Sequence, residues 1–211
     1  MDSMPHFETE KARFTHGIIY HMLYDRPLSE ARRVVMKLIK EGSFVLDIAS
    51  GTGELCFELA AEKRCRTVGI DLSRRMIEFA QKRNRYENVR FVHGDATDLA
   101  DFEPGTFDYA TILFTMHELP RQEQIAVLKE ALRVASCVIV VDSQVPLPRN
   151  LHGIALRLVE ASGGADHYRP FANYLATGGI SGILADSGVK ASIAQRSIFW
   201  YGCREIVVLE R

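Results

Sequence analysis

The chain has 211 residues, of which 47% are apolar and 25% charged, a composition typical of a soluble globular protein with one sizeable core. Its 26 basic and 27 acidic residues nearly cancel, which excludes an overall charge that would gather nucleic acid. No apolar run approaches the roughly 20 residues that span a bilayer, so we expect one soluble domain over residues 1–211.

The cysteines and the N-terminal sequence indicate the cellular compartment. Cys56, Cys65, Cys137 and Cys203 are scattered singly, which favours reduced thiols over a disulfide framework or a zinc site. The first residues lack the apolar core of a signal peptide. We therefore predict a cytoplasmic protein without a metal site.

Residues 1–40 have helical spacing, with an apolar stripe at Val34, Val35, Leu38 and Ile39 between basic residues. They predict an N-terminal helical cap that lies beside the sheet or over its open edge.

Residues 43–142 alternate short apolar runs with amphipathic segments. The runs are apolar along their whole length, which is typical of a parallel sheet covered by helices on both faces. The predicted strands are Phe44–Ile48, Thr67–Ile70, Val89–His93, Tyr109–Phe114 and Cys137–Asp142.

The alternation changes after Asp142. A segment at 150–188 has two predicted helices, Leu151–Ala161 and Pro170–Ser187. At 190–211, two strands, Ala191–Phe199 and Arg204–Leu209, are joined tightly enough to pair antiparallel. The whole pattern predicts an α/β protein with a Rossmann-like doubly wound sheet of seven strands, mostly parallel, with one antiparallel strand near the C-terminus.

A glycine-containing loop follows the first strand and leads into a helix. Gly51 and Gly53 let the backbone turn tightly and bring its amides close to a ligand, as in a nucleotide site. A dinucleotide fingerprint requires a third glycine, and Cys56 occupies that position. The loop therefore counts against a nicotinamide-dependent enzyme.

Acidic residues end the next two strands. Asp71 lies where its carboxylate can accept hydrogen bonds from both hydroxyls of a ribose. Asp95 follows the third strand on the same rim, where it can accept from an exocyclic amine such as adenine N6. Together they predict a nucleoside site.

Four segments in order, VLDIASGTGEL, VGIDLSRRMIEFAQKR, VRFVHGDATDL and FDYATILFTMHEL, carry a family resemblance across roughly residues 43–142. They resemble the class I S-adenosylmethionine-dependent methyltransferases, particularly the group with the ubiquinone and menaquinone biosynthesis C-methyltransferases. Many class I enzymes have glycine where this chain has Ala49, and the quinone-type group tolerates alanine there.

The resemblance implies a cofactor role for nine residues. The loop holds the methionine end, Asp71 the ribose, two apolar side chains flank the adenine, and the 95–96 pair recognises its amine. These residues are Asp47, Ala49, Gly51, Gly53, Asp71, Leu72, Met76, Asp95 and Ala96.

His117 is the candidate catalytic base, because FTMHELP follows the fourth strand at the rim that faces the transferable methyl. An unperturbed histidine titrates near pH 6.5 and is available as a base at neutral pH. The competing interpretation is a histidine that only caps the turn before a helix near Pro120. A zinc-protease motif is excluded because Arg121 stands where the second histidine would be.

Acceptor recognition is expected in the flanking segments. Aromatic side chains at helical spacing often line pockets for apolar acceptors, although ordinary core packing is the more common role of any single one. The candidates are His16, Tyr20, Tyr24, His167, Tyr168 and Phe171.

We therefore predict an enzyme, a monomer or homodimer, that transfers the methyl of S-adenosylmethionine to an aromatic or quinone-like small molecule and releases S-adenosylhomocysteine. The alternatives are an RNA methyltransferase, a non-catalytic cofactor-binding assembly partner and, last, an NAD(P)-dependent reductase. Nucleic acid is disfavoured because acidic residues interrupt the basic run between Arg74 and Arg90, which indicates a solvated helix face.

Overall fold

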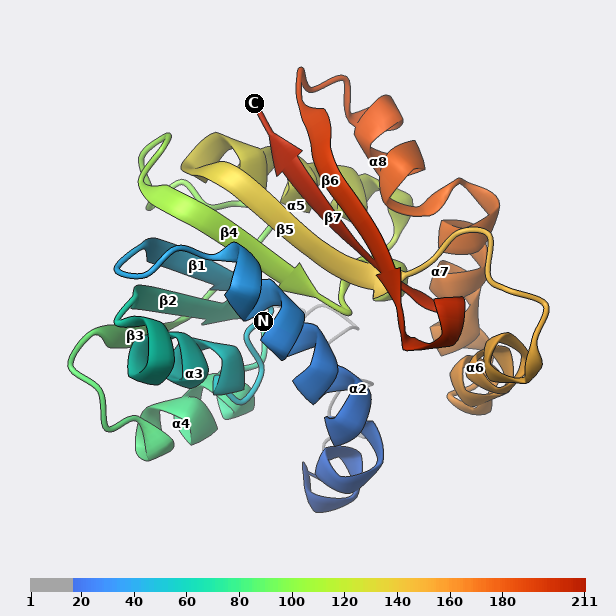
Figure 1. The fold of residues 1–211 in the computed structure, drawn as a ribbon, viewed down its shortest axis with the longest axis horizontal. Coiled ribbons are helices and arrows are strands. Elements are labelled where there is room, and N and C mark those ends of the chain that lie inside the picture. Colours follow the sequence, from blue (N-terminus) through green and yellow to red (C-terminus); the bar gives the residue numbers. More distant parts are fainter. Residues whose placement is uncertain (1–16) are drawn as a thin grey trace, which may run out of the picture. The chain divides into compact units, whose positions relative to one another are not determined.

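The computed structural model describes residues 17–211, with side chains from residue 28 onward (Figure 1). The chain divides into two compact units, Met1–Leu38 and Ile39–Arg211. The described part of the first unit is helix α2, Gly17–Leu38. The predicted placement of the N-terminal cap, and its boundary at residue 40, stay predictions.

The second unit is built on one seven-stranded sheet within the described residues, with strand order β3-β2-β1-β4-β5-β7-β6. Strands β1 to β5 pair in parallel, and β7 runs antiparallel to both of its neighbours. The predicted fold class is therefore confirmed. The strands are β1 (Phe44–Ile48), β2 (Arg66–Asp71), β3 (Val89–His93), β4 (Phe107–Leu113), β5 (Ala135–Ser143), β6 (Ser192–Phe199) and β7 (Arg204–Glu210).

Helices cover both faces of this sheet. One face carries α3 and α4, and the other carries α5 and α8, while α6 packs on α7. The elements are α3 (Glu54–Lys63), α4 (Arg74–Arg83), η1 (Met116–Glu118), α5 (Arg121–Val134), α6 (Leu151–Ser162), α7 (Ala165–Ala176), α8 (Gly179–Ser187) and η2 (Trp200–Gly202).

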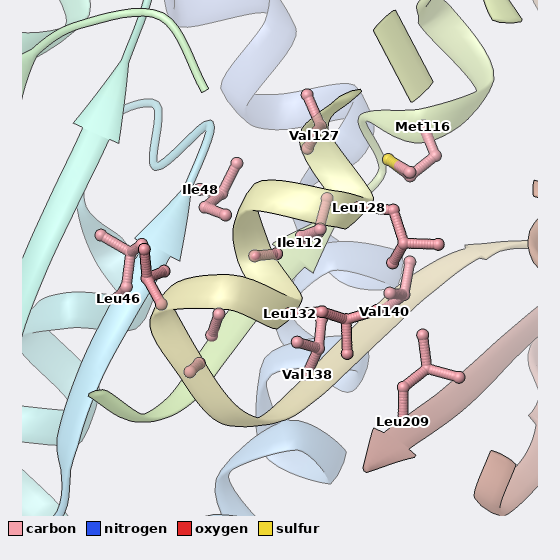
Figure 2. Packing of buried hydrophobic residues seen from close by; sticks show 14 of the residues in the cluster. Leu46, Ile48, Ile112, Met116, Val127, Leu128, Leu132, Val138, Val140 and Leu209 are labelled. Atoms are coloured by element: carbon pink, nitrogen blue, oxygen red, sulfur yellow. The ribbon is translucent and has the colours of Figure 1, made fainter. Parts of the chain in front are cut away.

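The larger core lies between α5, α8 and the sheet. Figure 2 shows Leu128 and Leu132 of α5 close to Val138 and Val140 of β5, all of them fully buried or nearly so. Burying each such side chain stabilises the fold by about 1.5–3 kcal/mol. This packing fixes β4 and β5, whose carboxyl ends carry part of the candidate site.

A smaller core holds the glycine loop against the sheet on the other face. The buried Phe91 ring of β3 fills the space that Gly53 and Gly69 leave open, and a methyl group on Gly53 would overlap that ring. Gly53 also has φ +82°, in the left-handed region. Two independent reasons therefore require glycine at the point where the loop enters α3.

We expect Gly53→Ala to lower the free energy of unfolding by about 2–4 kcal/mol, because it combines a left-handed alanine with overpacking against Phe91. Urea denaturation measures the loss. Gly105→Ala is the matched control, since Gly105 has φ +71° but open space around its Cβ position. Equal losses in both variants would show that the ring contact contributes nothing.

The prediction of one helix over Pro170–Ser187 was wrong. The chain forms α7, which begins at Ala165 and contains Pro170, and then a separate α8. Gly178 and Gly179 have φ of +85° and +57°, a left-handed conformation that stops one helix before the next starts.

Candidate cofactor and acceptor site

The predicted cofactor residues and His117 lie at one edge of the sheet, where the parallel strands end. The strand order places the carboxyl ends of β3, β2, β1, β4 and β5 side by side. From one end to the other, this edge carries Asp95, Asp71, the 49–53 loop, His117 and Asp142. The order reverses between β1 and β4, which is where open α/β sheets bind their ligands.

The 49–53 loop is a tight, left-handed turn. Ala49 and Gly51 have φ of +57° and +54°. The Ser50 amide donates to the Ile70 carbonyl at 3.0 Å, and the Gly53 amide donates to the Ser50 carbonyl at 2.9 Å. Because no atom lies within 4 Å of the Cβ position of Gly51, the backbone there is open to a ligand.

Asp71 is tied to this loop by its carboxylate. Its Oδ2 accepts from the Gly51 amide and its Oδ1 from the Ser73 amide, both at 2.8 Å. Each carboxylate oxygen can accept more than one hydrogen bond. An oriented, half-buried carboxylate at this place therefore fits the two hydroxyls of a ribose.

The adenine-side candidates lie next to Asp71 and on the loop after β3. Leu72 is 47% exposed, and Met76 is half-buried in the first turn of α4, where its amide donates to Ser73 Oγ. Asp95 is exposed and accepts from the amide and hydroxyl of Thr97 at 2.8 Å, with half-buried Ala96 between them. These positions fit the predicted base site.

Asp47 has an internal partner. It is buried, and Thr111 donates its hydroxyl to Asp47 Oδ1 at 2.7 Å, which joins β1 to β4. The nearby thiol of Cys56 has a pKa raised well above its ordinary value, chiefly by burial and then by the Asp47 charge. Asp47 therefore stabilises the base of the loop, and its cofactor role stays a prediction.

His117 lies in η1 and is 4% exposed. Its Nδ1 is 2.7 Å from Oδ1 of Asp142, and its amide donates to Asp142 Oδ2 at 3.2 Å. Burial alone would lower the pKa of His117, but the Asp142 charge and hydrogen bond overcome it and raise the pKa. Conversely, His117 holds the pKa of Asp142 below its ordinary value despite burial.

Three predicted acceptor residues of α7, His167, Tyr168 and Phe171, lie around this pair, together with Glu160 of α6. Glu160 Oε2 is 3.0 Å from His167 Nε2, and Glu160 Oε1 is 3.8 Å from His117 Nε2. The fully buried Phe171 ring meets the His117 ring edge to face at 5.8 Å, and half-buried Tyr168 packs on Phe171.

The N-terminal acceptor candidates are not tested by this structure. His16 lies outside the described residues, and Tyr20 and Tyr24 fall in α2, where the side chains are not described.

Three charged residues of this cluster were not predicted from the sequence: Asp142, Glu160 and Arg204. Arg204 opens β7 beside the end of β5, and its Nη1 donates to Ser143 Oγ at 2.6 Å. Its guanidinium lies over Phe114 and Trp200, at 4.8 and 5.6 Å from the ring centres. Asp142 and Arg204 could have been recognised in the sequence, because each is a charged residue at one end of an apolar strand.

The opposing pKa shifts of His117 and Asp142 predict how stability depends on pH. A histidine whose pKa is higher in the folded than in the unfolded protein stabilises the fold fully below about pH 6.5. This stabilisation is lost as the pH rises through the pKa of the folded protein. An aspartate whose pKa is lower in the folded than in the unfolded protein stabilises the fold fully above about pH 4. This stabilisation is lost as the pH falls through the pKa of the folded protein. We therefore expect the pair to stabilise the fold most between about pH 4 and 6.5.

Urea denaturation across this range checks the expectation. His117→Gln should flatten the decline on the alkaline side and leave the part that His167 contributes, because the hydrogen bond to Glu160 also raises the pKa of His167. An unchanged slope in His117→Gln would assign the whole decline to other groups.

A separate cavity of about 560 Å³ lies at the opposite edge of the sheet, near the amino ends of β1, β4 and β5. Lys40, Asp108 and Cys137 are among its lining residues. Burial and the nearby Glu210 charge raise the pKa of Cys137 to about 11, so its thiol is protonated and unreactive at neutral pH. Cys137 therefore gives this cavity no thiolate nucleophile at neutral pH.

Among the described residues, no group of acidic, histidine and cysteine side chains is arranged to hold a metal ion. In the same part of the chain, no helix is both long and apolar enough to cross a bilayer.

The chain is similar to known methyltransferases over about half of its length. Residues 45–136 match the model of the family described as a methyltransferase domain. A demethylmenaquinone methyltransferase of Staphylococcus saprophyticus is 36% identical over 107 residues, 49% of this chain and 45% of that protein. A Staphylococcus aureus enzyme of the same name is 38% identical over 108 residues. The chain thus spans about half the length of the curated relatives it matches.

Solved structures extend the similarity to most of the chain. A Pyrococcus horikoshii protein has 25% identity and a TM-score of 0.68, and the match covers 89% of this chain and 90% of that one. The magnesium protoporphyrin IX methyltransferase of Synechocystis, solved with S-adenosylhomocysteine, shares the fold at 21% identity and a TM-score of 0.62, covering 100% and 90%. Residues 45–136 are therefore a methyltransferase domain, and this domain is similar to those of the demethylmenaquinone methyltransferases.

Proposed function

We propose that the protein transfers the methyl of S-adenosylmethionine to an aromatic or quinone-like small molecule by direct displacement. The observation that carries the cofactor assignment is the Asp71 carboxylate at the end of β2, fixed by the Gly51 and Ser73 amides beside the strand-order reversal between β1 and β4. The names of the curated relatives support a quinone-like acceptor, and the four free cysteines fit a reducing cytoplasm.

The cofactor site follows from the residues at the carboxyl edge. Asp71 accepts the ribose hydroxyls, and the open backbone at Gly51 faces the methionine end. Leu72 and Met76 flank the adenine, and Asp95 with Ala96 binds its amine. The bound cofactor supplies an electrophilic methyl group on a sulfonium. The residues present fit this molecule because they combine a half-buried carboxylate, an open left-handed loop and an exposed apolar side chain.

The acceptor side is assigned to the neighbouring ends of β4 and β5. In a direct displacement, the acceptor atom would bond to the methyl carbon as the carbon–sulfur bond breaks, and the electron pair would stay on sulfur. The protein mainly aligns the reacting atoms in such a step. If the acceptor atom carries a proton, His117 takes it, with Asp142 holding the imidazole at Nδ1 and Nε2 directed away from that carboxylate.

We expect His117→Ala to lower turnover by roughly 10²- to 10⁴-fold if His117 is the base, and to leave cofactor affinity nearly unchanged. The wild-type rate should rise with pH as the histidine loses its proton, because its raised pKa keeps it protonated at lower pH. That pH dependence should disappear in the variant. A folded variant with unaltered kcat and pH profile would make His117 a positioning residue for η1.

Titration calorimetry with S-adenosylmethionine tests the cofactor assignment, and absence of binding would overturn the proposed function. Turnover is then measured as S-adenosylhomocysteine release with catechols, naphthols and reduced quinones. Binding without turnover on every acceptor would favour a non-catalytic assembly partner. Turnover on tRNA alone would favour the RNA methyltransferase.

A further inference from the structure

Helix α6 presents an apolar face to solvent. Leu151 is 82% exposed and Leu158 is 67% exposed, and Ile154 and Val159 are also exposed large apolar residues. At 100° per residue, Leu151, Ile154 and Leu158 fall on one side of the helix. The buried residues of α6, Gly153, Leu156 and Glu160, fall on the other side.

This arrangement is the reverse of an ordinary surface helix, which buries its apolar stripe. Gly153 lies directly against the Pro148 carbonyl, and Glu160 pairs with His167 of the adjacent α7. The helix thus attaches to the fold through Gly153, Glu160 and one buried apolar side chain, Leu156. Four large apolar side chains are left to the solvent.

The apolar face continues onto the connection between β6 and β7. Tyr201 of η2 is 66% exposed, and its ring stacks on that of His152 at 3.7 Å with an interplanar angle of 8°. Asn150 Nδ2 also donates to the Tyr201 carbonyl at 3.1 Å. We call the surface formed by Leu151, Ile154, Leu158, Val159 and Tyr201 the α6 face.

The charges around the α6 face are mainly basic. Between residues 144 and 176, the exposed charged residues are Arg149, Arg157, Arg169 and Asp166. Arg169 and Asp166 form a loose exposed pair with a closest distance of 3.9 Å, while the acidic Glu160 is buried and directed inward. The exposed rim is therefore complementary to an anionic surface, although the whole chain is nearly neutral.

We propose that the α6 face docks on an anionic lipid bilayer, with α6 lying in the plane of the headgroups. Apolar side chains rimmed by arginine are the chemistry of an interfacial helix, which inserts its apolar face at the acyl boundary. The 12 residues of α6 extend about 18 Å, less than the roughly 30 Å of a hydrocarbon core, so the helix lies on the bilayer and does not cross it.

Docking in this way brings the acceptor side of the fold to the lipid. The buried side of α6 carries Glu160, which contacts His167 and approaches His117. A bilayer under α6 therefore lies close to the residues assigned to the acceptor, where an apolar molecule can pass from the lipid to the protein.

Vesicle sedimentation with the full chain tests the proposal. We expect wild type to sediment with vesicles of phosphatidylcholine and phosphatidylglycerol, less with phosphatidylcholine alone, and less at about 1 M salt, where the Debye length is about 3 Å. Leu151→Ser with Leu158→Ser should weaken binding roughly tenfold or more, because two apolar anchors are lost. Arg157→Glu should reduce the preference for anionic vesicles.

Phe79→Ser is the matched control, because Phe79 is 48% exposed on α4, away from the α6 face. The single tryptophan of the chain, Trp200, adjoins this face through His152 and reports docking by its fluorescence. Absence of vesicle binding by wild type, or equal losses in the double variant and in Phe79→Ser, would overturn the proposal.

The oligomeric state gives a further contradicting outcome. A dimer in sedimentation velocity without vesicles, lost in the double variant, would assign the α6 face to contact between two copies. Cofactor titration of the same double variant keeps this test separate from the proposed function, because its affinity for S-adenosylmethionine should equal that of wild type.

Discussion

Replacing Asp71 with alanine should weaken S-adenosylmethionine binding by roughly 10- to 100-fold, equivalent to about 1.5–3 kcal/mol. The carboxylate is expected to accept both ribose hydroxyls, and charge-assisted hydrogen bonds of this type are stronger than neutral ones. The variant also frees the Gly51 and Ser73 amides, which Asp71 holds at 2.8 Å. It therefore removes a ligand contact and the anchor of the loop together.

Two further variants separate these effects. Asp71→Asn keeps an oxygen that can accept from one amide but loses the charge, so its affinity should fall between those of wild type and Asp71→Ala. Asp98→Ala is the matched control, because Asp98 is exposed and its carboxylate accepts from a local amide, that of Ala100. Titration calorimetry gives the dissociation constants. An unchanged constant in folded Asp71→Ala would remove the ribose role.

Replacing Asp142 with alanine should lower the free energy of unfolding by about 3–5 kcal/mol at pH 6. Asp142 is fully buried and accepts from the amide and ring of His117 and from the Ser143 amide. Its loss leaves the imidazolium of His117 in the interior without its nearest counter-charge, and deprives the nearby buried Arg204 of a balancing charge. Since small domains are stable by only about 5–15 kcal/mol, the variant should be markedly destabilised.

Urea denaturation at pH 6 and at pH 8 measures this loss. The difference in unfolding free energy between Asp142→Ala and wild type should shrink at pH 8. More His117 is neutral at that pH, so removal of the Asp142 carboxylate leaves less uncompensated charge in the interior. Asp186→Ala is the control, because Asp186 forms an exposed ion pair with Arg121 and should cost about 1 kcal/mol or less. A loss of only about 1 kcal/mol in Asp142→Ala as well would show that the buried pair of His117 and Asp142 contributes little to the free energy of unfolding.

Much of the fold was predictable from local sequence. The five apolar runs between residues 43 and 142 became β1 to β5 in parallel, and the last two runs became the antiparallel strands β6 and β7. Crossover helices fix the direction of consecutive parallel strands, so residues that end these strands meet at one edge. For this reason Gly51, Asp71 and Asp95 could be placed together from their positions in the chain.

Helix boundaries were less predictable between residues 165 and 187. Apolar spacing continues across Gly178 and Gly179, and only the positive φ angles that the packed chain adopts there separate α7 from α8. Pro170 was also a weak signal, because α7 accommodates it within its length.

The sequence by itself determined the sheet, the glycine loop and the acidic residues of the cofactor edge, because each depends on a short run of residues and on the fixed geometry of parallel strands. Only the tertiary structure decided the buried cluster of His117, Asp142 and Glu160, which come from three separate elements. It also decided which face of α6 is buried: Gly153, Leu156 and Glu160 face the fold, while Leu151 and Leu158 face solvent. Burial and charge pairing are set by what packs against a residue, and that neighbour lies elsewhere in the chain.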